Sequence, residues 1–244
     1  MLLRGKRKQN EKVGTVVIRK LTYNNRVLTA EERDAYCRKA DEYIDIYSGF
    51  IEEVFQLSKE AAAVLDNSES AEINKALLEI SAFTLYAFCD CIVLNKLFAR
   101  AGNPYEKSFL RGKWRVHLNE SFKKLYGFNK SCYKDSYCAK LEQIIIRFFP
   151  RFKGKFDELM SDFEQLSKES WWKEERNAEV HVDVAKLYEL RHEEINESKV
   201  VMEAGQLTSL IHRLDVFTRD MYGVYLNQLE TQFYKEHGYL PVFE

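Results

Sequence analysis

The segment WWKEERNAEVHVD, residues 171–183, places an arginine, an asparagine and a histidine close together. Arg176 is followed directly by Asn177, and His181 comes four positions after the asparagine. Histidine titrates near neutral pH and serves as a general base, whereas arginine stays charged and donates to phosphate oxygens through a fixed fork. An amide can orient the histidine or hold a phosphate oxygen. These residue types predict cleavage of RNA, in which the 2′-hydroxyl attacks the adjacent phosphorus.

Helix geometry limits which of these side chains can act together. Asn177 and His181 are four residues apart and share one face of a helix. Arg176 and His181 are five apart, about 140° around the axis, so a straight helix separates them. They converge if Arg176 lies in the first turn, and Ser167 or Ser170 is a candidate cap for a helix that starts there. The alternative is an ordinary solvated helix face.

The pattern Arg176-Asn177-x-x-x-His181 resembles the R-x4–6-H motif of HEPN domains, the higher eukaryotes and prokaryotes nucleotide-binding superfamily. The segment is also similar to the corresponding stretch of the abortive-infection AbiU2-like subgroup. The resemblance implies an all-α fold and a metal-independent endoribonuclease that leaves a 2′,3′-cyclic phosphate and a 5′-hydroxyl. It implies a homodimer with one composite active site, no cofactor, and a toxin or phage-defence setting with a possible antitoxin or regulatory protein.

Several other residues bear on this site. Arg111 and His117 form a second, looser match, with glycine in place of the polar residue after the arginine. Glu175 and Glu179 flank the motif, and either could pair with Arg176 in competition with phosphate. Glu179 is also a candidate supporting residue of the site. Asp90 lies in the most apolar segment, where it is either a residue that supports the motif from another helix or a buried core aspartate.

Composition favours a helical protein in a reducing compartment. The 244 residues include only 10 Gly and 3 Pro, fewer turn residues than a sheet-rich fold of this length needs. The five cysteines form no CxxC pair and no zinc pattern, so we expect reduced thiols, no metal site and a cytoplasmic location. Residues 80–94 are the most apolar stretch, which we interpret as a buried helix too short to span a bilayer, and we expect no membrane partner.

The order of segments predicts one domain behind a basic arm. Residues 1–29 begin with no secretory signal pattern, and residues 1–28 carry eight cations against one carboxylate. The alternating pattern of residues 15–29 predicts a short hairpin around Asn24-Asn25. Residues 30–244 predict a single all-α, up-and-down bundle of about seven helices. These helices are expected at about 30–65, 71–101, 105–126, 131–149, 154–168, 171–195 and 199–236.

A basic and aromatic stretch, residues 96–130, is a candidate surface for single-stranded RNA. It holds nine cations against two carboxylates, with aromatic residues between them. The residues predicted to contact RNA are Arg111, Lys113, Arg115, Lys123 and Lys124. The alternative is an amphipathic helix whose aromatic residues are core and whose lysines are solvated.

The sequence thus leaves two hypotheses for function. In the first, His181 is the general base or acid, Arg176 stabilises the transition state and Asn177 orients the reacting groups. In the second, the chain is a non-catalytic helical module that binds RNA, a nucleotide or a protein partner.

Overall fold

The computed structural model describes residues 29–63, 68–127, 130–169, 172–181, 183–192 and 197–239, and it is all-α over these ranges. This confirms the predicted fold class. The hairpin predicted for residues 15–29 lies outside the described residues, apart from Thr29. The elements are α1 (Ala30–Ala63), α2 (Ser68–Arg100), α3 (Pro104–Leu125), α4 (Lys130–Tyr133), α5 (Tyr137–Phe148), the 3₁₀ helix η1 (Pro150–Phe152), α6 (Lys153–Glu169), α7 (Trp172–His181), α8 (Val184–His192) and α9 (Glu197–His237).

Local signals in the sequence explain where two of these helices begin. At the start of α1, the Glu32 amide donates to Thr29 Oγ1 (3.2 Å) and the Thr29 amide donates to Glu32 Oε2 (2.8 Å). This reciprocal pair is the capping box that the sequence TAEE predicts. At the start of α3, Asn103 Oδ1 accepts from the Glu106 amide at 2.8 Å, and Pro104 occupies the first helical position.

Two of the predicted helices are each divided in two, which corrects the count of seven. The segment 131–149 forms α4 and α5, because Ser136 accepts a hydrogen bond from the Ala139 amide and starts a new helix there. The segment 171–195 forms α7 and α8. Asp183 divides it, since its carboxylate accepts from the Lys186 amide at 3.1 Å and caps α8. In both segments, a polar side chain that accepts a backbone hydrogen bond starts a new helix, although the apolar pattern continues across the break.

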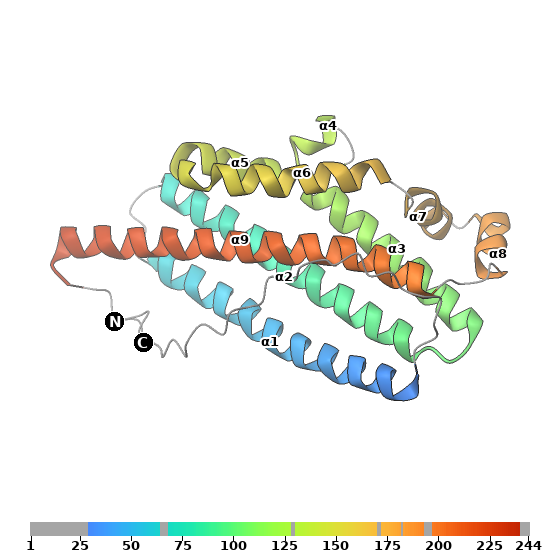
Figure 1. Ribbon diagram of the computed structural model, residues 1–244. Coiled ribbons are helices and arrows are strands. Elements are labelled where there is room, and N and C mark those ends of the chain that lie inside the picture. The colour runs from blue at the N-terminus through green and yellow to red at the C-terminus, as the bar shows by residue number, and fades with distance from the viewer. Residues whose placement is uncertain are drawn as a thin grey trace.

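The long helices α2 and α9 form the centre of the bundle (Figure 1), with α1 packed on α2 and α6 packed on α9. Fully buried side chains line both central helices, among them Leu77 and Leu85 on α2 and Leu207 and Ile211 on α9. Each such side chain stabilises the fold by about 1.5–3 kcal/mol through its burial. A polar contact also ties three helices together: Asn74 on α2 donates to the Ser58 carbonyl of α1 and accepts from the Tyr222 hydroxyl of α9.

Helix α2 is longer than the apolar segment of residues 80–94. Within the described residues, Glu69–Arg100 is one helix whose length and composition would allow it to cross a membrane. The apolar segment itself is shorter than this helix, which continues beyond it at both ends. Over half of its most apolar stretch is buried against the other helices of the bundle, as in the central helix of a helical core.

Helices α7 and α8 lie together at one end of the bundle, where both pack on α3 (Figure 1). The long final helix α9 runs back along the bundle from this end. The predicted motif thus sits on a short helix attached to the side of α3, ahead of the last helix of the chain.

Candidate functional site

Helix α7 presents part of the motif to solvent. Ala178 is buried, and the side chain of Glu179 is only 5% exposed, so this face of the helix lies against the bundle. Asn177 and His181 are both exposed, and their spacing of four residues places them on a common face. The structure therefore agrees with the predicted pairing of the amide and the imidazole.

The position of Arg176 differs from the one that the motif geometry favours. Helix α7 begins at Trp172, so Arg176 lies in its second turn and not in its first. Ser167 is not its cap, because it lies within α6 and its hydroxyl donates to the Glu164 carbonyl. The side chain of Arg176 lies outside the described residues. On the described backbone, Arg176 and His181 point about 140° apart around α7.

A buried ion pair fixes α7 against α3 and α8. Arg191 Nη2 lies 2.6 Å from Glu179 Oε1, and Arg191 Nη1 donates to the Ser108 carbonyl of α3 at 2.7 Å. The carboxylate reaches this position because residue 112 is glycine. A Cβ atom at Gly112 would overlap the Glu179 carboxylate and lie 3.1 Å from Arg191 Nη1. Glu179 is thus engaged by Arg191 on the buried side of α7, so it is a structural residue and does not support the motif as predicted.

Asp90 is neither buried nor placed in the apolar core. Its side chain is 63% exposed, and its Oδ2 lies 3.9 Å from His117 Nδ1. The interpretation of Asp90 as a buried core aspartate was wrong, because Asp90 lies on the exposed face of α2, where a carboxylate needs no buried partner. The contact that the structure gives Asp90 is with His117 of α3.

The second sequence match does not form a pair of catalytic groups. Arg111 is 4% exposed, and its Nη2 donates to the Leu190 carbonyl of α8 at 2.6 Å. His117 contacts α2 instead, with Nε2 3.2 Å from the Ala87 carbonyl. The two side chains therefore bind different helices, and both have structural roles.

The stretch predicted to bind RNA divides into buried and exposed cations. Arg111 and Arg115 are 4% and 5% exposed, which removes them from any RNA-binding surface. Lys113, Lys123 and Lys124 are exposed. The prediction failed for the arginines because charge alone does not show which face of a helix is buried. A guanidinium can be buried when backbone carbonyls accept hydrogen bonds from it, as Leu190 does for Arg111.

Exposed apolar side chains on α7 and on the two helices that pack with it were not predicted. Large apolar side chains are exposed on α3, α7 and α8, which pack together. We call this set the motif-side surface; its members are Tyr105 (67% exposed), Phe109 (42%), Val180 (43%), Val184 (74%) and Tyr188 (66%). Several exposed apolar side chains on adjoining helices are typical of a surface that another protein covers. Val180 and Val184 are four residues apart but lie on different helices, α7 and α8, so their spacing gave no signal of a shared face.

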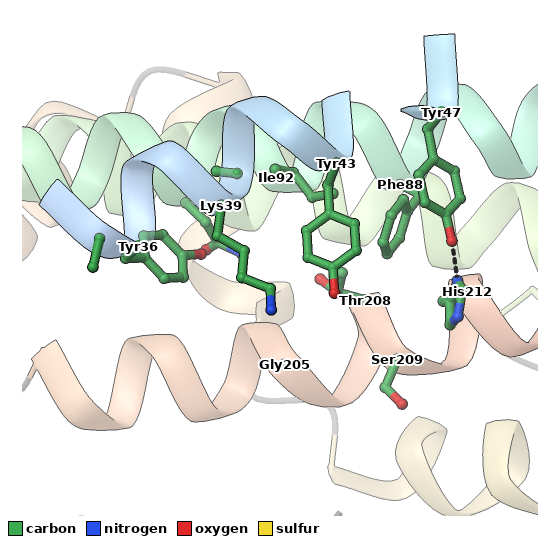
Figure 2. A pocket seen from close by; sticks show the side chains of 13 residues that line it. Tyr36, Lys39, Tyr43, Tyr47, Phe88, Ile92, Gly205, Thr208, Ser209 and His212 are labelled. Carbon is green, nitrogen blue, oxygen red and sulfur yellow. Dashed lines mark hydrogen bonds between the residues drawn. The ribbon is translucent and has the colours of Figure 1, made fainter. Parts of the chain in front are cut away.

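A groove of about 580 Å³ lies elsewhere, between α1, α2 and α9 (Figure 2). The Tyr47 hydroxyl lies 2.8 Å from His212 Nδ1 at one end of it. Burial raises the pKa of Tyr47 to about 12, and burial together with Arg219 lowers the pKa of His212. Tyr47 therefore keeps its proton, and the direction of the hydrogen bond depends on which imidazole nitrogen of His212 is protonated. Tyr36 and Tyr43 are 39% and 41% exposed along this groove.

Among the described residues, no three histidine, cysteine, aspartate or glutamate side chains are grouped to hold a metal ion. Comparison of the chain with models of protein families, with curated proteins and with solved structures finds no match.

Proposed function

We propose that this chain is a metal-independent endoribonuclease of the HEPN type, with Arg176, Asn177 and His181 as its catalytic residues. The observation that carries the proposal is the exposure of Asn177 and His181 on one face of α7, while the opposite face is fixed by the Glu179–Arg191 pair. Positioning a phosphodiester requires reactive side chains that the substrate can reach, on a helix whose orientation is fixed by its contacts with the rest of the protein.

The chemistry needs only the RNA and these three side chains. His181 removes the proton of a 2′-hydroxyl as its oxygen attacks the adjacent phosphorus. The phosphorus–O5′ bond breaks, which leaves a 2′,3′-cyclic phosphate and a 5′-hydroxyl oxygen that takes up a proton. Arg176 stabilises the charge that develops on the phosphorane oxygens, and Asn177 holds the imidazole or a phosphate oxygen.

The geometry of α7 favours a site built from two copies of the chain. The backbone positions of Arg176 and His181 lie about 140° apart around the axis of α7, so the two residues do not share one face of the helix in a single copy. In the proposal, the arginine of one copy acts with the histidine of the other. The motif-side surface lies on α7 and on the two helices that pack with it, and it supplies apolar area for such a contact.

The biological setting that we propose is a cytoplasmic toxin or phage-defence factor. An antitoxin or regulatory protein would then restrain the enzyme, and the motif-side surface is also the place where such a partner would block RNA.

A second candidate is a non-catalytic helical module that binds RNA, a nucleotide or a protein partner. The observation that favours it is the second-turn position of Arg176, which separates the arginine from the histidine within one copy. The two candidates differ in one measurable property, because a binding module leaves RNA intact.

The experiment is incubation of a mixed tRNA and mRNA pool with the purified chain in EDTA. The native chain is compared with His181→Ala, Arg176→Ala and the control His192→Ala, which removes an exposed histidine from the neighbouring helix. The proposal predicts cleavage by the native chain and by the control, and none by the two motif variants. Intact RNA with every protein, or cleavage that His181→Ala leaves unchanged, favours the binding module.

A further inference from the structure

The groove between α1, α2 and α9 has walls and dimensions suited to a small ligand. Its volume of about 580 Å³ falls within the range of small-molecule sites, roughly 300–1,000 Å³. Phe88 and Ile92 of α2 and Tyr43 of α1 form apolar and aromatic walls, and Figure 2 shows them facing the space between α1 and α9. Such walls accept a flat or elongated apolar body.

One charged side chain lines this groove. Lys39 of α1 stands at its rim, with Nζ 5.9 Å from the centre of the Tyr43 ring. Among the described residues, no carboxylate pairs with Lys39. The neighbouring charges are matched, because Asp41 binds Lys96 and Asp215 binds Arg219. The groove therefore carries a single positive charge that no described carboxylate neutralises.

We propose that this groove binds an amphipathic monoanion, a small molecule with an elongated apolar body and one acidic group. The apolar body lies along Tyr43, Phe88 and Ile92, and the acidic group lies at Lys39. A single anionic group matches the single cation, Lys39. The apolar walls disfavour a more highly charged molecule, because its further charges would lose water without gaining a partner.

The same observations argue against the other occupants. RNA carries one negative charge per nucleotide and needs several cations along its path, whereas this groove offers one. The N-terminal arm, residues 1–28, carries eight cations against one carboxylate and would bring like charge to Lys39. The groove lining comes from α1, α2 and α9 and includes no residue of α7, so this proposal does not depend on the ribonuclease proposal.

Gly205 of α9 provides a direct way to close the groove. It lines the groove, and a Cβ atom built on it meets nothing within 4 Å. A side chain at this position therefore begins in open space at the groove, and glycine replacement also favours the helix. Gly223 on the same helix likewise has nothing within 4 Å but does not line the groove. The two positions form a matched pair for substitution.

The test uses the fluorescent aromatic sulfonate 8-anilinonaphthalene-1-sulfonate as a probe and monomeric dodecanoate as its competitor. Dodecylammonium and dodecanol are the matched competitors, with the same chain and the opposite charge or none. The proposal predicts saturable binding of the probe at one site and displacement by dodecanoate. It predicts displacement up to about fivefold weaker by the other two, since an exposed ion pair contributes a factor of at most about this size.

Substitutions then assign the binding to the groove. Gly205→Leu should abolish displaceable binding, and Lys39→Met should weaken dodecanoate by about fivefold while leaving dodecanol unchanged. Gly223→Leu and Lys59→Met, which changes an exposed lysine of α1 outside the groove, should bind as the native chain does. Equal competition by dodecylammonium, or native binding by Gly205→Leu, would overturn the proposal, as would the absence of any saturable displacement.

Discussion

Glu179 of α7 and Arg191 of α8 form an ion pair, Oε1 to Nη2 2.6 Å, with side chains only 5% and 13% exposed. The pair lies on the side of α7 opposite Asn177 and His181, and it is completed by the Ser108 carbonyl of α3. Three helices thus meet at one guanidinium. The helix that carries the motif has 10 residues, and this contact ties its buried side to α3 and α8.

Arg191→Met should lower the free energy of unfolding by about 2–4 kcal/mol, because it leaves the buried carboxylate of Glu179 without its counterion. Denaturant unfolding monitored by circular dichroism measures this change. Lys168→Met, which breaks an exposed pair with Glu164, is the control and should cost less than about 0.5 kcal/mol. Equal losses for the two variants would show that the buried pair has no special role.

Gly112→Ala and Gly49→Ala should change stability in opposite directions, although both replace a glycine inside a helix. At Gly49 a Cβ meets nothing within 4 Å, so helix propensity alone acts and stabilises by up to about 1 kcal/mol. At Gly112 the Cβ displaces the Glu179 carboxylate, and we expect a net loss of about 1–3 kcal/mol. Thermal unfolding of the two variants tests this, and stabilisation by Gly112→Ala would contradict the described contact between α3 and α7.

His212→Gln should flatten the dependence of stability on pH. Burial, and then Arg219, lower the pKa of His212 in the folded protein. Below the ordinary histidine pKa of about 6.5, His212 takes up a proton in the unfolded chain but not in the folded protein. The free energy of unfolding therefore decreases as the pH is lowered. Glutamine keeps an acceptor for the Tyr47 hydroxyl and does not titrate.

The measurement for His212 is the difference in free energy of unfolding between about pH 7.5 and about pH 5.5, for the native chain and the variant. The native chain should lose more stability over this interval. Asp215 on the same helix has its pKa raised by burial, which acts with the opposite sign at lower pH and is common to both proteins. Parallel curves for the two proteins would exclude the predicted contribution of His212.

Val184→Asp should disrupt the proposed pairing of two copies without unfolding the chain. Val184 is 74% exposed, so an aspartate there costs the monomer little, whereas a second copy would have to bury the charge. We expect a shift from dimer to monomer in sedimentation velocity and a loss of RNA cleavage of at least about tenfold. Ile46→Asp, at a 52% exposed position on α1, is the control. A native sedimentation profile for Val184→Asp would place the contact elsewhere.

Mixing Arg176→Ala with His181→Ala tests whether the arginine and the histidine act from different copies. If they do, a mixed dimer contains one site with both native groups and recovers up to about half of the native activity. If both groups act from the same copy, every site in the mixed dimer lacks one of them. Cleavage assays on the mixed and the separate variants distinguish these results, and continued inactivity of the mixture would refute the composite arrangement.

The sequence predicted the helices well where apolar spacing and caps agree. The capping box at Thr29 and Glu32 lies where the pattern places it, and α3 begins at Pro104, one residue before the expected start at 105. The same spacing predicted continuous helices across Ser136 and Asp183, where the structure has a break. Apolar periodicity does not indicate that a polar side chain caps a new helix.

The candidate site was predictable in its exposed residues and not in its support. Asn177 and His181 share a solvent face, as their spacing indicates. The contacts on the buried side of α7 and α8 join residues that are distant in the chain. The Glu179 carboxylate approaches Gly112, where a side chain would overlap it, and the Leu190 carbonyl accepts a hydrogen bond from the buried Arg111. One sequence does not show such pairings, which also explains why buried arginines were assigned to an RNA surface.

The most direct test of the account is the chemistry of the cleaved ends. RNA treated with the native chain in EDTA is analysed by mass spectrometry, beside RNA treated with His181→Ala and RNA carrying a 2′-deoxy nucleotide at the mapped cleavage position. The account predicts 2′,3′-cyclic phosphate and 5′-hydroxyl ends from the native chain, and no cleavage by the variant or at the deoxy position. Cleavage at the deoxy position, or native product formation by His181→Ala, would contradict it.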